Sequence, residues 1–290
     1  MNDKLVSFLF QTNAFKVCAE NNPFWLTSGL VSPYFVNTHF LFGNEQESVS
    51  LLNFIQNCLE TTDKTKLPQM IFEKVLFQYE NNEVFKSTID LLKKLVENNI
   101  DVNNIDYISG GERRDWYFSI MIAYLFKLPH ITIFKDQSVV VSTSDFKETK
   151  KITKLENKKI LHIADLLTKA SSYINYWDPA IKKLGSNILW SAVVVDRLEG
   201  GDETLQDLKI ESLSLLKLDN SLFEKANELN IITNNQLEML KKFKEDPYNY
   251  MRNFLIEHPE FLENALNSED SKTVKRAKYC IENNLYKLNN

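Results

Sequence analysis

The sequence predicts an α/β protein built on a mainly parallel sheet that is flanked by helices. Apolar strand-like segments alternate with segments of helical spacing from about residue 105 to about residue 218. This alternation is typical of parallel sheets whose crossover connections are helices. The run 187–197, NILWSAVVVDR, is almost continuously apolar, as expected of a strand covered on both faces. In such sheets ligands bind beyond the carboxyl ends of the strands, so the loops at those ends are candidate sites.

Hydrophobic spacing and breaking residues place the other elements. Short aromatic strands follow a first helix and are interrupted at Gly29 and Pro33. An amphipathic helix capped by Asn44 covers 44–60. The remaining segments are two helices within 68–99, a strand at 105–111, a helix at 114–128, strands at 129–136, 137–145 and 157–165, a helix at 170–184, strands at 187–197 and 210–218, and helices after about 220.

The composition limits the class of protein. The 290 residues include 43% hydrophobic and 25% charged residues, which is typical of a globular protein. A net charge of −5 argues against general nucleic-acid binding, since no basic surplus is present to neutralise a phosphate backbone. The widely spaced Cys18, Cys58 and Cys280 favour a reducing compartment over a disulfide framework or a zinc site. With no signal-peptide pattern or long apolar run, we expect a cytoplasmic protein without a membrane partner.

The segment 109–116, SGGERRDW, follows a predicted strand and opens a helix. Gly110 and Gly111 permit close approach of a ligand to the backbone. Arg113 and Arg114 offer forked donors that suit phosphate oxygens, and the helix start adds a positive end. The alternative is a turn with Asp115 as a helix cap and two solvated arginines. The coincidence of glycines, arginines and a helix start favours an anion site.

The segment 160–173, ILHIADLLTKASSY, combines a strand, an acid and hydroxyl side chains. Asp165 can accept hydrogen bonds from two ribose hydroxyls. Thr168, Ser171 and Ser172, with the backbone N–H groups behind them, can hold a phosphate. The alternative is a strand followed by an ordinary N-capped helix, which is common.

A third loop, within 193–203, VVVDRLEGGDE, ends another buried strand. Arg197 can pair with a ligand carboxylate through two hydrogen bonds. The alternative, a surface pair of Asp196 and Arg197 followed by a glycine turn, is equally consistent with the residues. The histidines have no metal-ligand spacing, so we expect no protein metal site, and His130 and His162 are expected in or near the core.

Taken in order, these segments resemble the type I phosphoribosyltransferases, and among them the orotate phosphoribosyltransferases. The likeness extends over about residues 10–240. Residues 107–136 resemble the pyrophosphate-loop strand, its helix and the next strand, which ends at Lys135–Asp136. Residues 160–172 fall on the signature for the phosphoribosyl donor, and 193–203 resemble the Asp-Arg-x-Glu-Gly-Gly of the orotate branch. The N-terminal matches are Ser28, Gly29, Ser32, Pro33, Tyr34, Phe35 and Asn37.

The resemblance implies the phosphoribosyltransferase fold with an N-terminal hood segment and a C-terminal helical extension. The expected segments are 1–100, the hood and helices packed with the core; 101–244, the core; and 245–290, the extension. It also implies a homodimer. The implied reaction transfers ribose 5-phosphate from 5-phosphoribosyl 1-pyrophosphate to orotate or a related base, in pyrimidine nucleotide biosynthesis, with Mg²⁺ held mainly by the substrate.

The resemblance also assigns roles to residues of this sequence. Asp165, Lys135, Arg113 and Arg114 would be catalytic. Phe35, Asn37 and Arg197 would bind the base. The donor would be bound by Gly110, Gly111, Asp165, Thr168, Lys169, Ala170, Ser171 and Ser172.

The sequence departs from the family pattern at several positions. The donor signature has Ala164 where the family carries a first acid, and Lys169 and Ala170 follow Thr168. The segment 137–151, in the place of the family's mobile loop, has no histidine or glycine, although Lys147, Lys150 and Lys151 are candidate substitutes for its lysine. These departures support an alternative: a nucleotide-binding or regulatory protein of this fold with weak or absent catalysis. The C-terminal helices are also a candidate partner-docking module.

Overall fold

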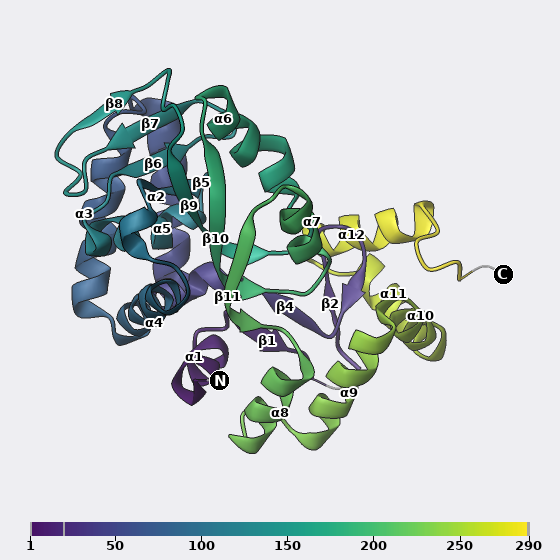
Figure 1. The fold of residues 1–290 in the computed structure, drawn as a ribbon. Coiled ribbons are helices and arrows are strands. Elements are labelled where there is room, and N and C mark those ends of the chain that lie inside the picture. The colour runs from purple at the N-terminus through teal and green to yellow at the C-terminus, as the bar shows by residue number, and fades with distance from the viewer. Residues whose placement is uncertain (1, 20, 289–290) are drawn as a thin grey trace. The chain divides into compact units, whose positions relative to one another are not determined.

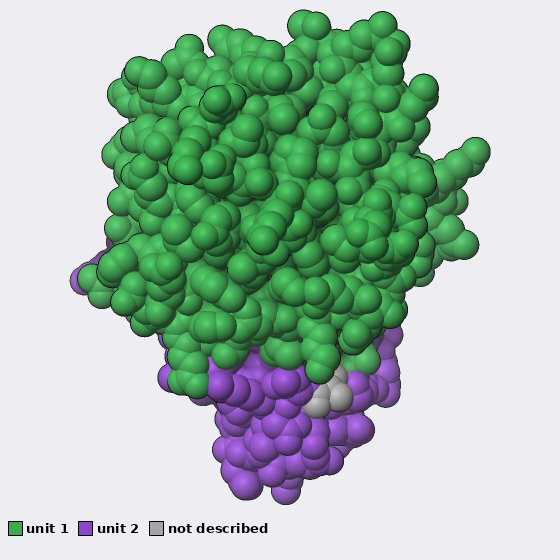
Figure 2. Space-filling view, turned by 60° about the vertical axis from the view of Figure 1, so that its left-hand side comes forward, with its two compact units in different colours: residues 1, 38–219 green, residues 2–37, 220–290 purple. Residues whose placement is uncertain are grey.

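The computed structural model describes residues 2–19 and 21–288. The chain forms two compact units, coloured separately in Figure 2. Unit 1 contains residues 38–219, and unit 2 combines 2–37 with 220–290. These boundaries differ from the segment boundaries expected at residues 100 and 244. The reason is packing: the helices of 45–99 lie against unit 1 elements, whereas the N-terminal strands share a core with the C-terminal helices.

Unit 1 is built on a sheet that contains seven strands among the described residues, in the order β11-β10-β9-β5-β6-β7-β8 (Figure 1). The first five strands in this order run parallel, and β7 and β8 continue the sheet antiparallel at one edge. The predicted mainly parallel sheet with flanking helices is therefore confirmed. The strands are β5 (Tyr107–Gly111), β6 (His130–Ile133), β7 (Val139–Ser142), β8 (Thr149–Lys151), β9 (Lys159–Leu167), β10 (Asn187–Asp196) and β11 (Glu211–Lys217).

Helices cover this sheet, and the most deeply buried is α5. The sequence predicts a helix there with one buried face, but residues 115–123 are all buried, because α3 and α4 pack on the side of α5 that turns away from β5 and β9. Asn44 caps α2 as predicted, its side chain accepting from the Glu47 N–H. The helices of unit 1 are η1 (Thr38–Phe42), α2 (Glu45–Thr61), α3 (Leu67–Asn81), α4 (Glu83–Asn99), η2 (Val102–Asn104), α5 (Asp115–Phe126), η3 (Tyr173–Trp177), α6 (Asp178–Lys183) and α7 (Gly201–Asp207).

The segment in the place of the family's mobile loop forms the β7–β8 hairpin. Phe146, at its turn, is fully buried, and its ring stacks on Phe72 of α3 with 4.7 Å between centroids. The sequence predicts the first strand but not β8, which carries Lys150 and Lys151. The two lysines have low strand propensity, but they form a strand here because they pair with β7. The hairpin is thus an anchored part of the sheet.

Unit 2 joins the two ends of the described chain in one core. The Phe15 ring lies 6.0 Å from that of Phe223, and Trp25 stacks on Phe261 at 5.5 Å. None of the helices in residues 2–19 and 21–288 is long and apolar enough to cross a membrane. The elements of unit 2 are α1 (Asp3–Gln11), β1 (Phe15–Val17), which pairs with β4 (Tyr34–Val36), β2 (Phe24–Trp25), which pairs with β3 (Val31–Ser32), α8 (Asn220–Glu228), α9 (Asn234–Glu245), α10 (Pro247–Glu257), α11 (Pro259–Leu266) and α12 (Ser271–Glu282).

Candidate functional site

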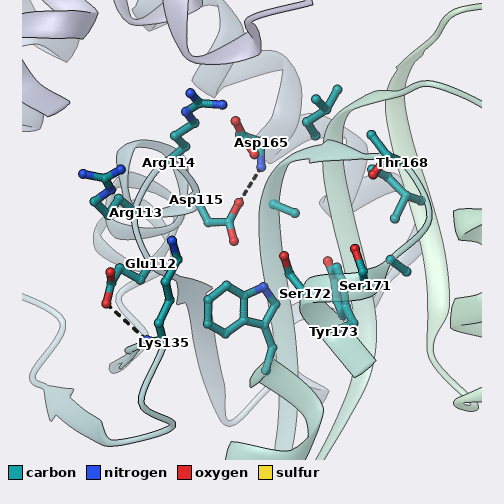
Figure 3. A pocket seen from close by; sticks show the side chains of 15 residues that line it. Glu112, Arg113, Arg114, Asp115, Lys135, Asp165, Thr168, Ser171, Ser172 and Tyr173 are labelled. Atoms are coloured by element: carbon teal, nitrogen blue, oxygen red, sulfur yellow. Dashed lines mark hydrogen bonds between the residues drawn. The ribbon is translucent and has the colours of Figure 1, made fainter. Parts of the chain in front are cut away.

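A cavity of about 340 Å³ opens at the carboxyl ends of β5 and β9 (Figure 3). These strands are neighbours in the sheet, and β6 lies on the other side of β5. Because all three are parallel, the loops that follow them emerge at the same edge. Two loops that the sequence singles out separately therefore line one cavity. Its lining residues are Glu112, Arg113, Arg114, Asp115, Lys135, Ala164, Asp165, Leu166, Leu167, Thr168, Ala170, Ser171, Ser172, Tyr173 and Trp177.

Three basic side chains lie on one side of the cavity (Figure 3). The Arg113 guanidinium donates to the side-chain oxygen of Gln56 in α2. Arg114 is exposed, and no hydrogen bond or ion pair engages its guanidinium among the described residues. The Lys135 backbone N–H donates to Glu112 Oε2 at 3.1 Å, while its ammonium likewise has no such partner within the described chain. Cations without internal partners are available to an anionic ligand.

Hydroxyl side chains lie on the opposite side of the cavity, in the loop between β9 and η3 (Figure 3). Ser171 and Ser172 are exposed at the start of η3, and Thr168 is partly buried. The loop turns at Ala170, whose φ of 53° is in the left-handed region. Lys169 is exposed and is not among the residues that line the cavity. The hydroxyls can donate to phosphate oxygens, as the sequence predicts for this loop.

Asp165 projects from β9 into the same cavity. It is 8% exposed, and its Oδ2 has no hydrogen-bond partner among the described residues. Burial and the neighbouring carboxylate of Asp115 raise the pKa of Asp165 to about 8, although the charge of Arg114 acts in the opposite direction. A buried carboxyl oxygen without a donor is costly to the fold and is therefore a sign of a functional site.

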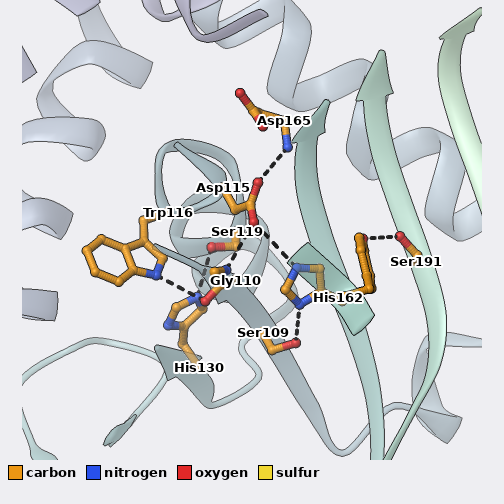
Figure 4. Close-up of polar contacts among 11 residues, drawn as sticks. Ser109, Gly110, Asp115, Trp116, Ser119, His130, His162, Asp165 and Ser191 are labelled. Carbon is orange, nitrogen blue, oxygen red and sulfur yellow. Dashed lines mark hydrogen bonds and ion pairs between the residues drawn. The ribbon is translucent and has the colours of Figure 1, made fainter. Parts of the chain in front are cut away.

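Asp115 is a site residue that the sequence indicates only as a helix cap. Its carboxylate connects the tips of two strands. Oδ1 accepts from the Asp165 N–H at 2.9 Å (Figure 4), and Oδ2 accepts from the Gly111 N–H at 3.2 Å. Oδ2 also lies 3.5 Å from His162 Nε2. The available signal was an acid at the start of a strongly apolar helix, a position expected to be buried.

The two glycines of the first loop are buried but do not line the cavity. A Cβ at Gly110 would overlap Ser119, and one at Gly111 would overlap the indole ring of Trp177. In this structure their small size admits protein side chains, a packing role that differs from the predicted approach of a ligand. The peptide bond between Glu112 and Arg113, just after them, is cis.

His130 and His162 are fully buried, which confirms that they belong to the core. His162 Nδ1 lies 2.9 Å from Ser109 Oγ. His130 contacts the hydroxyls of Thr132 and Ser119 at 3.0 Å and 2.9 Å, and burial lowers its pKa to about 3. Among the described residues no group of three or more His, Cys, Asp or Glu side chains could hold a metal ion.

The loop after β10 lies next to the loop between β9 and η3, but its residues do not line the cavity. The Arg197 N–H donates to the Leu167 carbonyl at 2.9 Å, which ties this loop to the end of β9. The Arg197 guanidinium pairs with Glu199 at 2.8 Å. Asp196 is fully buried, and its carboxylate accepts from the Leu198 N–H at 2.8 Å. Within this loop the predicted cation is therefore paired with a carboxylate of its own loop.

The other predicted residues lie elsewhere. Phe35 belongs to β4 of unit 2, where its ring lies 4.8 Å from that of Phe24. Asn37 follows β4, and its N–H donates to the Ala14 carbonyl at 2.8 Å. Their roles in base binding stay predictions. The candidate substitutes for the loop lysine, Lys147, Lys150 and Lys151, lie in the β7–β8 hairpin and do not line the cavity.

Comparison with known proteins identifies relatives among phosphoribosyltransferases, although no family model matches the chain. The chain is 26% identical to an adenine phosphoribosyltransferase of Shewanella frigidimarina over 185 residues, which cover 60% of this chain and 97% of that protein. It is 27% identical to an orotate phosphoribosyltransferase of Methanosphaera stadtmanae over 130 residues, 45% of this chain and 70% of that one.

Solved structures show the same fold. The orotate phosphoribosyltransferase of Francisella tularensis superposes with a TM-score of 0.54 at 16% identity, covering 83% of this chain and 98% of that one. The UMP synthase of Leishmania donovani superposes with a TM-score of 0.52 at 15% identity; the match covers 83% of this chain but 41% of that longer one. In its parallel sheet and in its loops at the strand ends, the chain has the fold of the type I phosphoribosyltransferases, and its sequence is similar to members of that family.

Proposed function

We propose that this protein transfers a 5-phosphoribosyl group from 5-phosphoribosyl 1-pyrophosphate to a nucleobase. One observation carries the proposal: the buried, unpartnered carboxyl oxygen of Asp165 faces the same cavity as the available cations Arg114 and Lys135. A pentose that carries phosphates at both ends offers hydroxyls to the acid and anionic oxygens to the cations. The hydroxyls of Ser171 and Ser172 supply donors for the second phosphate.

The proposed residues act by positioning and by electrostatics. The bond between ribose C1 and the pyrophosphate oxygen breaks, and the electron pair leaves with pyrophosphate. A base nitrogen forms the new bond to C1 and gives up its proton to the solvent. Arg113, Arg114 and Lys135 stabilise the negative charge that develops on the leaving group. Asp165 holds the ribose hydroxyls, so that C1 is presented to the base in a fixed orientation. No nucleophile from the protein is required.

We treat Mg²⁺ as part of the donor substrate. This ion prefers oxygen ligands, keeps several waters and commonly binds through substrate phosphates. It would therefore enter with the pyrophosphorylated sugar, held mainly by substrate oxygens, and would supply positive charge there. The polar cavity, with its serine and threonine hydroxyls, fits such a hydrated complex.

We propose orotate, or a related carboxylated pyrimidine, as the acceptor, which places the reaction in pyrimidine nucleotide biosynthesis. The support is the loop Asp196–Arg197–Leu198–Glu199–Gly200–Gly201, which matches the orotate branch. Arg197 would bind the base. Adenine is the second candidate acceptor, because the match to an adenine phosphoribosyltransferase covers 97% of that relative.

The test is a turnover assay with purified protein, 5-phosphoribosyl 1-pyrophosphate, Mg²⁺ and a panel of bases that includes orotate and adenine. We expect release of pyrophosphate with one of these bases. The control is the Asp165→Asn variant, which should release pyrophosphate much more slowly. Absence of pyrophosphate release with every base would count against the proposed reaction.

A nucleotide-binding protein without turnover is the alternative, and two observations favour it. Ala164 stands in the place of a family acid, and the β7–β8 hairpin is anchored by the buried Phe146. Thermal stabilisation by nucleotides together with zero turnover would select this alternative.

We further propose a cytoplasmic homodimer, as the resemblance implies. Light scattering after size-exclusion chromatography would measure the mass relative to the 33.8 kDa of one chain. A single-chain mass over a wide range of concentrations would contradict the dimer.

A further inference from the structure

The segment expected to bind the donor lacks one acid, because Ala164 stands on β9 where the family carries a first acid. Ala164 precedes Asp165 and is 2% exposed. Its side chain belongs to a buried apolar cluster that includes Tyr173 and Trp177. With a methyl group at this position, β9 presents Asp165 as its one carboxylate to the cavity. A ribose has two neighbouring hydroxyls, and β9 would then supply a carboxylate acceptor for only one of them.

A second carboxylate reaches the cavity from another element. Asp115 is the first residue of α5, lines the same cavity as Asp165 and is 8% exposed. Its carboxylate accepts from the N–H group of Gly111 and from that of Asp165, the latter drawn in Figure 4, and these two hydrogen bonds fix its orientation. Each carboxylate oxygen can accept two hydrogen bonds, so each of the two keeps acceptor capacity for a ligand.

Two buried residues on neighbouring strands, His162 and Ser109, support the carboxylate of Asp115. His162 lies 3.5 Å from Oδ2 and is itself positioned by Ser109 at 2.9 Å (Figure 4). All of these residues are buried. Residues of both β5 and β9 therefore support the Asp115 side chain. This side chain also contacts the backbone of Asp165, the residue expected to bind ribose. Support of this kind is what a ligand-binding carboxylate requires for a defined geometry.

We propose that Asp115 accepts a ribose hydroxyl beside Asp165, so that helix α5 supplies the acid that β9 lacks at Ala164. This inference rests on the proposed phosphoribosyl transfer and assigns the second ribose contact of that site. The competing explanation is that Asp115 only ties β5 to β9. The two explanations predict different affinities after the charge of Asp115 is removed. In the first, only sugars that carry one particular hydroxyl bind more weakly; in the second, all ligands are affected equally.

The experiment compares three sugars on the intact protein. Ribose 5-phosphate, its 2-deoxy analogue and its 3-deoxy analogue are titrated calorimetrically into the wild type and into Asp115→Asn, after thermal unfolding has verified that the variant is folded. We expect Asp115→Asn to weaken ribose 5-phosphate about tenfold, the loss of one hydrogen bond to a charged group. Affinity for one deoxy analogue should stay unchanged, so that the preference for ribose over that analogue is lost.

Asp196→Asn is the matched control. Asp196 is also a buried acid at a strand end that accepts a backbone N–H, but it does not line the cavity. This variant should keep the full preference for ribose. If Asp115→Asn weakens all three sugars by the same factor, or none of them, the inference is overturned.

Two further outcomes separate this inference from the proposed function. If the wild type does not distinguish ribose 5-phosphate from either deoxy analogue, the proposed ribose site itself fails. If Asp115→Asn does not fold, a structure of the wild type with ribose 5-phosphate decides. A sugar hydroxyl within about 3 Å of the Asp115 carboxylate would support the inference, and a longer separation would overturn it.

Discussion

The loops after β5 and after β10 contain nearly the same residue types but differ in what those residues contact. Residues 110–115 and 196–203, which include these loops and the ends of the flanking elements, each contain two glycines, at least one arginine and at least two acids, at the carboxyl end of a parallel strand. In the first loop Arg114 has no ion-pair partner among the described residues. In the second loop Arg197 pairs with Glu199. The difference shows that the same composition can present a cation or neutralise it.

Sheet order explains the difference in part. β5 lies between β9 and β6, so its loop shares a cavity with residues that follow both neighbours. The β10 loop is tied through Arg197 N to the Leu167 carbonyl, on the far side of the β9 loop from Arg114. We therefore expect the β5 loop to act on the phosphorylated donor and the β10 loop to act on the base. The following predictions test this division.

The largest effect is expected for Arg114→Ala. Loss of an available cation at a developing negative charge should lower kcat/KM for 5-phosphoribosyl 1-pyrophosphate about hundredfold. Steady-state kinetics with the donor varied would measure it. Arg197→Ala is the matched comparison and should leave the KM for the donor nearly unchanged. Equal losses in both variants would show that both loops act on the donor.

The pH dependence of stability should differ between the wild type and Asp165→Asn. The folded-state pKa of Asp165 is raised to about 8, above its ordinary value. The contribution of the Asp165 carboxyl to the free energy of unfolding of the wild type is therefore most favourable below about pH 4. This contribution is lost as the pH rises through about 8. At pH 9 the free energy of unfolding of Asp165→Asn should exceed that of the wild type by more than it does at pH 5. The change should be at least about 1.4 kcal/mol, which corresponds to one pKa unit.

Urea unfolding at both pH values would measure this change. Asp196→Asn should show a change of the same sign, because burial also raises the pKa of Asp196. A difference between wild type and Asp165→Asn that stays constant from pH 5 to pH 9 would contradict the expected ionisation.

A smaller effect is expected for Arg197→Ala on the base. Its KM for the acceptor base should rise about tenfold, the cost of one charge-assisted hydrogen bond. Arg197→Lys should restore little of this, since an ammonium cannot reproduce a two-bonded contact with a carboxylate. Kinetics with the base varied at saturating donor would measure both. An unchanged KM in both variants would remove Arg197 from the base site.

The smallest effect is expected for Glu199→Gln. The Arg197–Glu199 pair is partly exposed, with 21% and 34% of the two side chains accessible, so the stability of the protein should change by less than about 1 kcal/mol. Thermal unfolding would measure this. A larger loss would mean that the pair holds the β10 loop in its conformation.

Much of the fold could be predicted from the sequence because the signals are local. The Asn44 cap, the apolar run of β10 and the glycine-rich ends of strands depend on residues a few positions apart. The alternation of these elements along the chain predicts a parallel sheet. The buried histidines are likewise predicted by the apolar strands that contain them.

Only the tertiary structure decided which side chains meet. Asp115 and Asp165 are 50 positions apart and come together because β5 pairs with β9. The β8 strand forms because it pairs with β7 and because the Phe146 ring stacks on that of Phe72. Periodicity along the chain reports which face of an element is buried, but the partner on that face is set by sheet order and long-range packing.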